Sequence, residues 1–261
     1  MLYIRFLALF AFSMVFLKLF GHLLRLMSSE IKIHRTMMSR FKFILALVLT
    51  VVMTLSCVTV SKSRVTESRK VPAFNTLLIG APASVHFTQG EPRGIKIVAP
   101  QSVIDQLTTK VVEGQLVVKY NKRHFRSSDI DIYITAPTLD GIVLNGTGDF
   151  ECQRLSSERP VSMNLTGAGD IDIKELLCPA ASLNLTGAGD VNVAFKNTQA
   201  VNVALSGAGD IDLAFAKCGM VTCQVSGAGD INLAGEVRGL KKSIAGVGDI
   251  NTSKLSILDR Q

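Results

Sequence analysis

The sequence predicts an all-β protein, a right-handed parallel β-helix or β-solenoid with coils of about 20 residues. A four-residue block, Gly-small-Gly-Asp, occurs six times between residues 146 and 249, with successive Asp positions 21, 20, 20, 20 and 19 residues apart. Apolar and polar residues alternate on both sides of the block, as in LNLTGAGDVNV at residues 183–193. Alternation with a period of two is typical of strands. A near-constant longer period is typical of stacked repeats, in which each unit buries its apolar positions against the next.

Each Gly-small-Gly-Asp block is predicted to be a turn between two strands. Gly is favoured where a backbone turns sharply or takes a positive φ. If the coils stack in register, neighbouring Asp side chains lie ~4.8 Å apart, and their repulsion costs about 0.9 kcal/mol per pair in a water-like dielectric. We expect hydrogen bonds from backbone N–H groups at the turn to offset this cost, which gives the Asp a structural role. The predicted turn residues are Gly146, Gly148, Asp149, Gly167, Gly169, Asp170, Gly187, Gly189, Asp190, Gly207, Gly209, Asp210, Gly227, Gly229, Asp230, Gly246, Gly248 and Asp249.

Calcium binding is the alternative role for the block. Gly-x-Gly-x-Asp repeats in toxin-type β-rolls bind Ca²⁺, which would place a row of ions on Asp170, Asp190, Asp210 and Asp230. Those rolls are built from nonapeptides that also carry a Gly-Gly pair, and this chain has neither the short period nor the pair. We therefore expect no metal site and no cofactor.

Residues 71–136 lack the block and predict a less regular, strand-rich N-terminal part of the domain. The segments SVHFTQ, GIKIVAP, QLVVKY and DIDIYITAP alternate or are β-branched, with turn signals at residues 89–92 and 113–114 between them. Residues 101–107 predict a single helical turn. We expect this part to begin or cap the solenoid, since an exposed first coil would be an open sheet edge.

Residues 1–56 predict a signal or leader region. Residues 37–57, MMSRFKFILALVLTVVMTLSC, combine a basic start, an apolar run and a small residue before a Cys, which is the layout of an export signal. The position of Cys57 resembles the lipobox of bacterial lipoproteins, so we expect Cys57 to carry a lipid and residues 57–70 to form a tether. An ordinary signal peptide or a short anchor is the alternative. We expect translation to start at Met37 or Met38, and a transmembrane helix is the alternative for the upstream residues.

The basic character of the chain belongs to this leader. The net charge is +7, of which residues 1–56 carry +6 and residues 57–261 carry +1. The folded part therefore gives no support for nucleic-acid binding. Its densest basic cluster is Lys119, Lys122, Arg123 and Arg126, which predicts a charged hairpin tip. Contact with anionic lipid headgroups or lipopolysaccharide phosphates is the functional alternative for that cluster.

No motif predicts catalysis. The Ser-Gly-Ala-Gly segments lack the spacing of a nucleophile elbow, no nucleotide-binding fingerprint occurs, and His86 and His124 belong to no metal-spaced pair. The block Asp recurs in every coil, which suits a structural position better than a unique active site. Cys178 and Cys218 are expected in one column but two coils apart, beyond disulfide reach. The sequence is compatible both with a Cys218–Cys223 disulfide and with buried free thiols.

A resemblance to a known family rests on four segments. The LTGAGD and LSGAGD blocks, the preceding ITAPTLDGIVLNGTGD and the upstream VPAFNTLLIGAPASVHFTQG resemble the head-GIN domain of auto-transporter adhesins, over about residues 71–255. The resemblance implies one head-GIN-like domain at residues 71–261 with a largely β-helical fold. It also implies export to the envelope, commonly as a lipoprotein of Bacteroidetes-like bacteria, and it assigns no catalytic or binding residues.

These observations predict a non-enzymatic, exported envelope lipoprotein with a β-solenoid binding or adhesin-like domain. We expect it to be lipid-anchored to the outer membrane, on the periplasmic face or at the cell surface, with a polysaccharide or protein of the envelope as partner. The alternatives are a structural or oligomerisation module that forms homo-oligomers, a calcium-binding β-roll and a carbohydrate-active β-helix. Residues 137–261 contain three aromatic residues, Phe150, Phe195 and Phe215, so few platforms for stacking on sugars are expected there.

Overall fold

The computed structural model describes residues 63–121 and 130–258, which belong to one compact unit at residues 62–261. In these residues the chain forms strands β1 to β18 and one short helix, α3 (Gln101–Ile104), where the sequence predicts a helical turn. The leader and Cys57 lie outside the described residues, but residues 64–69 of the expected tether form a strand that pairs with residues 95–100, so this part of residues 57–70 belongs to the folded domain. The strands are β1 (Arg64–Arg69), β2 (Thr76–Gly80), β3 (Ser84–Gln89), β4 (Gly94–Pro100), β5 (Leu107–Val112), β6 (Gln115–Tyr120), β7 (Asp131–Ala136), β8 (Gly141–Leu144), β9 (Asp149–Cys152), β10 (Leu155–Ser156), β11 (Val161–Leu165), β12 (Ile171–Leu177), β13 (Ala180–Leu185), β14 (Val191–Lys196), β15 (Ala200–Leu205), β16 (Ile211–Val225), β17 (Ile231–Ile244) and β18 (Ile250–Ile257).

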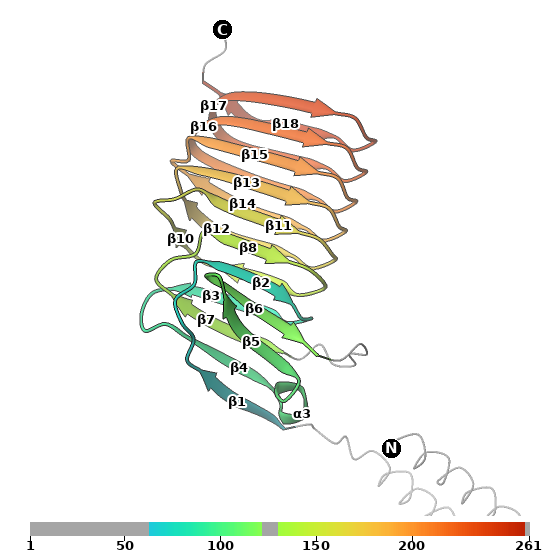
Figure 1. The fold of residues 1–261 in the computed structure, drawn as a ribbon. Coiled ribbons are helices and arrows are strands. Elements are labelled where there is room, and N and C mark those ends of the chain that lie inside the picture. The colour runs from blue at the N-terminus through green and yellow to red at the C-terminus, as the bar shows by residue number, and fades with distance from the viewer. Residues whose placement is uncertain (1–62, 122–129, 259–261) are drawn as a thin grey trace, which may run out of the picture. The chain divides into compact units, whose positions relative to one another are not determined.

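The strands stack as a β-solenoid, which confirms the predicted fold class (Figure 1). Each coil contributes one strand to each of two parallel rows. The first row runs β6, β2, β8, β11, β13, β15 and then the second halves of β16 and β17. The second row runs β7, β3, β9, β12, β14, the first halves of β16 and β17, and β18. Residues one repeat apart are paired, so Leu183 lies between Met163 and Val203.

The N-terminal part begins the solenoid in an order that the chain does not follow. The coil of β2 and β3 lies between the coil of β6 and β7 and the coil of β8 and β9, although β6 and β7 come later than β3 in the chain. Beyond β6 and β7 the strands turn antiparallel: β5 pairs with β6, β4 with β7, and β1 with β4. These antiparallel strands cover the first coil, so this part both begins and caps the solenoid.

The core lies between the two rows and is built from columns of like residues. Leu165, Leu185 and Leu205 are paired across successive coils, and each is 1% exposed or less. The rings of Phe195 and Phe215 stack with centroids 5.6 Å apart. Apolar burial of this kind is the main favourable contribution to folding.

The glycines of the turn blocks are required by the close approach of neighbouring coils. A Cβ on Gly187 would lie 1.8 Å from the carbonyl oxygen of Gly167, and a Cβ on Gly207 would lie 1.8 Å from that of Gly187. Among the block glycines only Gly146 has a positive φ, 151°. Close packing between coils, rather than positive φ, therefore explains the other block glycines, whereas at Gly146 a Cβ would have nothing within 4 Å and the positive φ is what favours Gly.

Candidate functional site

The block Asp residues form one column along the solenoid. The Oδ1 atom of each Asp accepts a hydrogen bond from the backbone N–H of the Asp on the next coil, at 2.8–3.1 Å. At the end of the column, Asp249 accepts one from the N–H of Ile250 at 2.7 Å. From Asp149 to Asp230 each donor lies on the neighbouring coil and not in the acceptor's own turn, so each of these carboxylates links two coils.

The structure aligns Asp170, Asp190, Asp210 and Asp230 but groups none of them with further metal ligands. Across residues 63–121 and 130–258 no three His, Cys, Asp or Glu side chains converge as metal ligands. The same residues contain no helix that is long and apolar enough to span a membrane.

The basic cluster is only partly placed. Lys119 lies in β6, and Lys122, Arg123 and Arg126 lie outside the described residues together with His124. Anion contact by this cluster therefore stays a prediction, as does lipidation of Cys57.

The four cysteines of the domain are free and buried: Cys152, Cys178, Cys218 and Cys223. Thr198 follows Cys178 in its column, with the Cys178 Sγ atom 3.9 Å from Thr198 Oγ1. Burial raises the pKa of Cys223 to about 12. Burial also raises the pKa of Cys152 to about 11, against the opposing effect of its hydrogen bond to the Arg154 carbonyl. Thiols of this kind are protonated at neutral pH and serve as small apolar core residues.

The outer face of the second row carries a continuous column of polar side chains. Backbone pairing places one outward residue of each strand directly above the next, from β4 to β18. We call this column the polar ladder. It consists of Lys96, Tyr133, His86, Glu151, Asp172, Asn192, Asp212, Asn232 and Asn251.

One end of the polar ladder is occupied by its own contacts. The rings of His86 and Tyr133 stack with centroids 4.9 Å apart, and the Lys96 Nζ atom lies 5.6 Å from the centroid of Tyr133. His86 Nδ1 lies 3.0 Å from Glu151 Oε2. Tyr133 is 43% exposed, but its two neighbours in the ladder cover its two faces. Its ring therefore presents an edge and a hydroxyl, rather than a flat face on which a sugar could stack.

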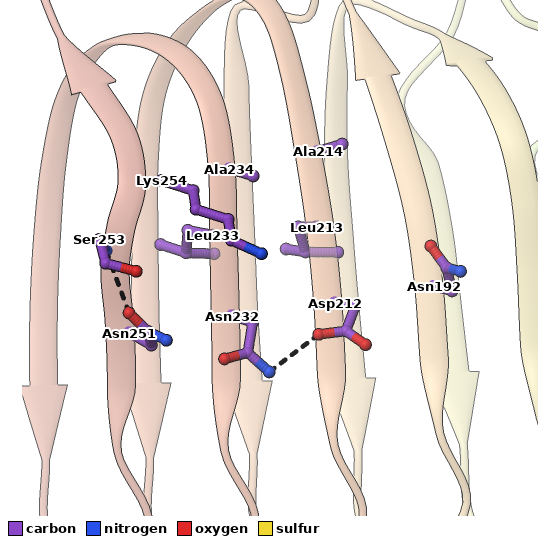
Figure 2. Close-up of a pocket in the computed structure, with 10 residues that line it drawn as sticks. All are labelled: Asn192, Asp212, Leu213, Ala214, Asn232, Leu233, Ala234, Asn251, Ser253 and Lys254. Carbon is purple, nitrogen blue, oxygen red and sulfur yellow. Dashed lines mark hydrogen bonds between the residues drawn. The ribbon is translucent and has the colours of Figure 1, made fainter.

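The other end of the polar ladder forms a groove of about 410 Å³ on the solenoid face (Figure 2). The row of ladder amides and the Asp212 carboxylate forms one side, and the small Ala214 and Ala234 lie further along the same strands. Asp212 Oδ1 accepts a hydrogen bond from Asn232 Nδ2 at 2.8 Å. The groove is lined by Asn192, Asp212, Leu213, Ala214, Asn232, Leu233, Ala234, Asn251, Ser253 and Lys254.

Most polar atoms in this groove are free to bind a ligand. Asn251 Oδ1 accepts a hydrogen bond from the Ser253 N–H at 3.0 Å, and the Asn192 side chain makes no hydrogen bond within the described residues. Each Asn offers a donor and an acceptor, Asp212 offers acceptors, and Lys254 offers donors. Such a set can hold a ligand rich in hydroxyl or amide groups. It lies on an open face rather than in an enclosed pocket, which suits binding better than catalysis.

The sequence shows these residues as polar positions of strands but does not predict the groove. The available signal was an alanine two positions after three successive ladder residues, in Asn192-Val-Ala, Asp212-Leu-Ala and Asn232-Leu-Ala. In stacked coils this spacing places a line of small side chains beside a line of polar ones.

Comparison with known proteins agrees with this architecture. The family model described as "putative auto-transporter adhesin, head GIN domain" matches residues 73–253. No curated protein matches the chain. A crystal structure of a putative adhesin from Bacteroides fragilis is 26% identical with a TM-score of 0.62, covering 73% of this chain and 97% of that chain. A putative lipid binding protein from Parabacteroides distasonis is 18% identical, with a TM-score of 0.47 and the same coverage of both chains.

Proposed function

Because the chain belongs to the head GIN domain family, we propose that it is a non-enzymatic, adhesin-like binding protein of the cell envelope that holds a glycan in the groove of the polar ladder. The similarity to the putative adhesin from Bacteroides fragilis supports the adhesin-like part of this proposal. The observation that carries the site is the groove itself, with amide side chains on one side and alanine methyl groups on the other.

The charges around the groove favour a neutral or cationic glycan. The column of block Asp residues runs beside the polar ladder, two residues away along each strand, as Asp190 does beside Asn192 and Asp210 beside Asp212. A polyanionic chain would be repelled by this column, whereas a neutral sugar would find hydrogen-bonding partners. The coil spacing of ~4.8 Å is close to the length of one pyranose unit, so an extended glycan can meet equivalent side chains on successive coils.

Export and a lipid anchor complete the proposed function. The signal-like residues 37–57 and the position of Cys57 support an envelope protein held at the outer membrane by a lipid on Cys57. Metabolic labelling with a fatty-acid analogue should label the wild-type chain and leave Cys57→Ser unlabelled. Equal labelling of both chains would contradict the lipid anchor on Cys57 but would leave the proposed glycan site unaffected.

Binding is tested with the full chain and an array of linear hexasaccharides that are neutral, amino-sugar or anionic. We expect the neutral or amino-sugar probes to bind and the anionic probes to bind at least about tenfold more weakly. Ala214→Trp fills the groove and should abolish binding. Ala204→Trp is the matched control, because Ala204 points outward at an equivalent position on the first row. Absence of binding to every hexasaccharide, or equal losses in the two variants, would contradict the proposal.

A further inference from the structure

The last coil of the solenoid ends in an open strand edge. This coil consists of β18 and residues 239–244 of β17. Among the described strands β18 pairs only with β17, and residues 239–244 pair only with β16. Figure 1 shows this coil at the end of the stack, opposite the end that β1, β4 and β5 cover. A free edge presents unpaired backbone N–H and C=O groups that can pair with another strand.

The inward side chains of the last coil are uncovered as well. Ile244 is 44% exposed, whereas Val225, its partner in the preceding coil, is fully buried at 0%. Leu240, Leu255 and Ile257 pack against the core but stay half-buried. The end of the solenoid therefore offers an apolar strip beside the free edge, which a further strand would bury.

The charge of this coil selects the kind of strand that can bind. Lys242 takes an inward position and pairs with the buried Cys223, although the column beneath it is apolar. Lys241 and Lys254 are also exposed in this coil, and Asp249 is the single acidic residue in 239–258. A second copy placed edge to edge would bring lysines against lysines. Lysines on a sheet edge oppose such self-pairing, while they attract a strand that carries carboxylates.

We infer that the last coil binds a β-strand of an acidic partner protein by addition to the free edge of β17. The added strand places apolar side chains over Leu240 and Ile244 and a carboxylate against Lys242 between them. Main-chain hydrogen bonds hold the strand, and the alternate side chains give specificity. This site lies on the end of the solenoid and does not depend on the groove of the polar ladder.

Two labelled peptides test this inference, Thr-Val-Thr-Glu-Thr-Val-Thr and its counterpart with Lys in place of Glu. Their Val, Glu or Lys, and Val side chains share one face and match Leu240, Lys242 and Ile244. Fluorescence polarisation with the full chain should show the Glu peptide binding at least about tenfold more tightly than the Lys peptide. Lys242→Glu should invert this preference, and Lys242→Met should remove it.

Lys110→Glu is the matched control, because Lys110 is an exposed lysine in β5 at the capped end. It should bind both peptides as the wild type does, and circular dichroism should show the same strand content in every variant. Equal binding of the two peptides, no binding of either, or the same loss in Lys110→Glu would overturn the inference. A wild-type dimer in sedimentation experiments that excludes the Glu peptide would overturn it too, because a second copy would then occupy the edge.

Discussion

Substitution of a single turn glycine tests whether close approach between coils determines the turn sequence. In Gly187→Ala the new Cβ would meet the Gly167 carbonyl oxygen at 1.8 Å, so the two turns must separate by about 1.2 Å to reach the 3.0 Å below which Cβ contacts are essentially never found. That separation breaks or lengthens the bond from the Ala188 N–H to the Gly167 oxygen, 2.8 Å, and the bond from the Asp190 N–H to Asp170 Oδ1, 2.9 Å. The bond from the Ala208 N–H to the Gly187 oxygen, 2.9 Å, is disturbed on the other side.

Loss of about three hydrogen bonds at ~1 kcal/mol each predicts a destabilisation of about 3 kcal/mol. For a domain of this size the midpoint of thermal unfolding should fall by about 6–12 °C, measured by far-UV circular dichroism. Gly94→Ala is the control, because a Cβ on Gly94 has nothing within 4 Å. It should leave stability unchanged or raise it by up to about 1 kcal/mol. If the two variants unfold within a degree or so of each other, close approach is not what requires Gly in the turns.

Three further predictions follow from buried and edge residues. Burial raises the pKa of Cys223 from 9.0 to about 12. The contribution of this thiol to the free energy of unfolding is therefore fully present below pH 9 and is lost as pH rises from 9 towards 12, because the unfolded chain releases the proton first. Urea unfolding of Cys223→Val should therefore depend less on pH above 9 than that of the wild type. Gln89→Ala should lower the free energy of unfolding by about 2 kcal/mol, because the Gln89 side-chain amide forms hydrogen bonds with the Pro137 carbonyl and with the backbone C=O and N–H of Ser156. A variant that unfolds in urea at the same concentration as the wild type would contradict this prediction. Lys242→Ile should make the chain self-associate in sedimentation experiments, because the lysine that opposes pairing between two free edges is gone. A variant that stays monomeric at all concentrations would refute this role of Lys242.

The repetitive half of the fold could be predicted because each of its strands pairs with the strand one repeat away in the chain. Every coil repeats one pattern, so the spacing of the Gly-Asp blocks sets both the pairing partner and the register of each strand. The Cys178 column shows the strength of this rule, since counting along the repeat places Cys178 and Cys218 two coils apart. The structure agrees, with Thr198 between them, one repeat from each.

The N-terminal half could not be predicted at the same level because its pairings are not local. Its strands were visible in the sequence, but nothing in the alternation indicates that β2 and β3 lie between β6–β7 and β8–β9. That arrangement depends on pairing between strands that are far apart in the chain, which is a property of the assembled sheet. It also brings His86 and Tyr133, which are far apart in the chain, into one stack in the polar ladder. The sequence had indicated His86 only as a strand residue.

The Asp column shows why a line of like charges is compatible with a stable solenoid. Repulsion between neighbouring carboxylates costs about 0.9 kcal/mol per pair in a water-like dielectric. Each of these pairs is matched by a hydrogen bond from a backbone N–H to a carboxylate, as between Asp210 and Asp190 at 2.9 Å, and bonds to charged groups contribute about 1.5–3 kcal/mol. The bond is larger than the repulsion in every step. Because its donor lies on the next coil, the bond forms only when the two coils are in register, so the same Asp that raises the electrostatic cost also fixes how the coils stack.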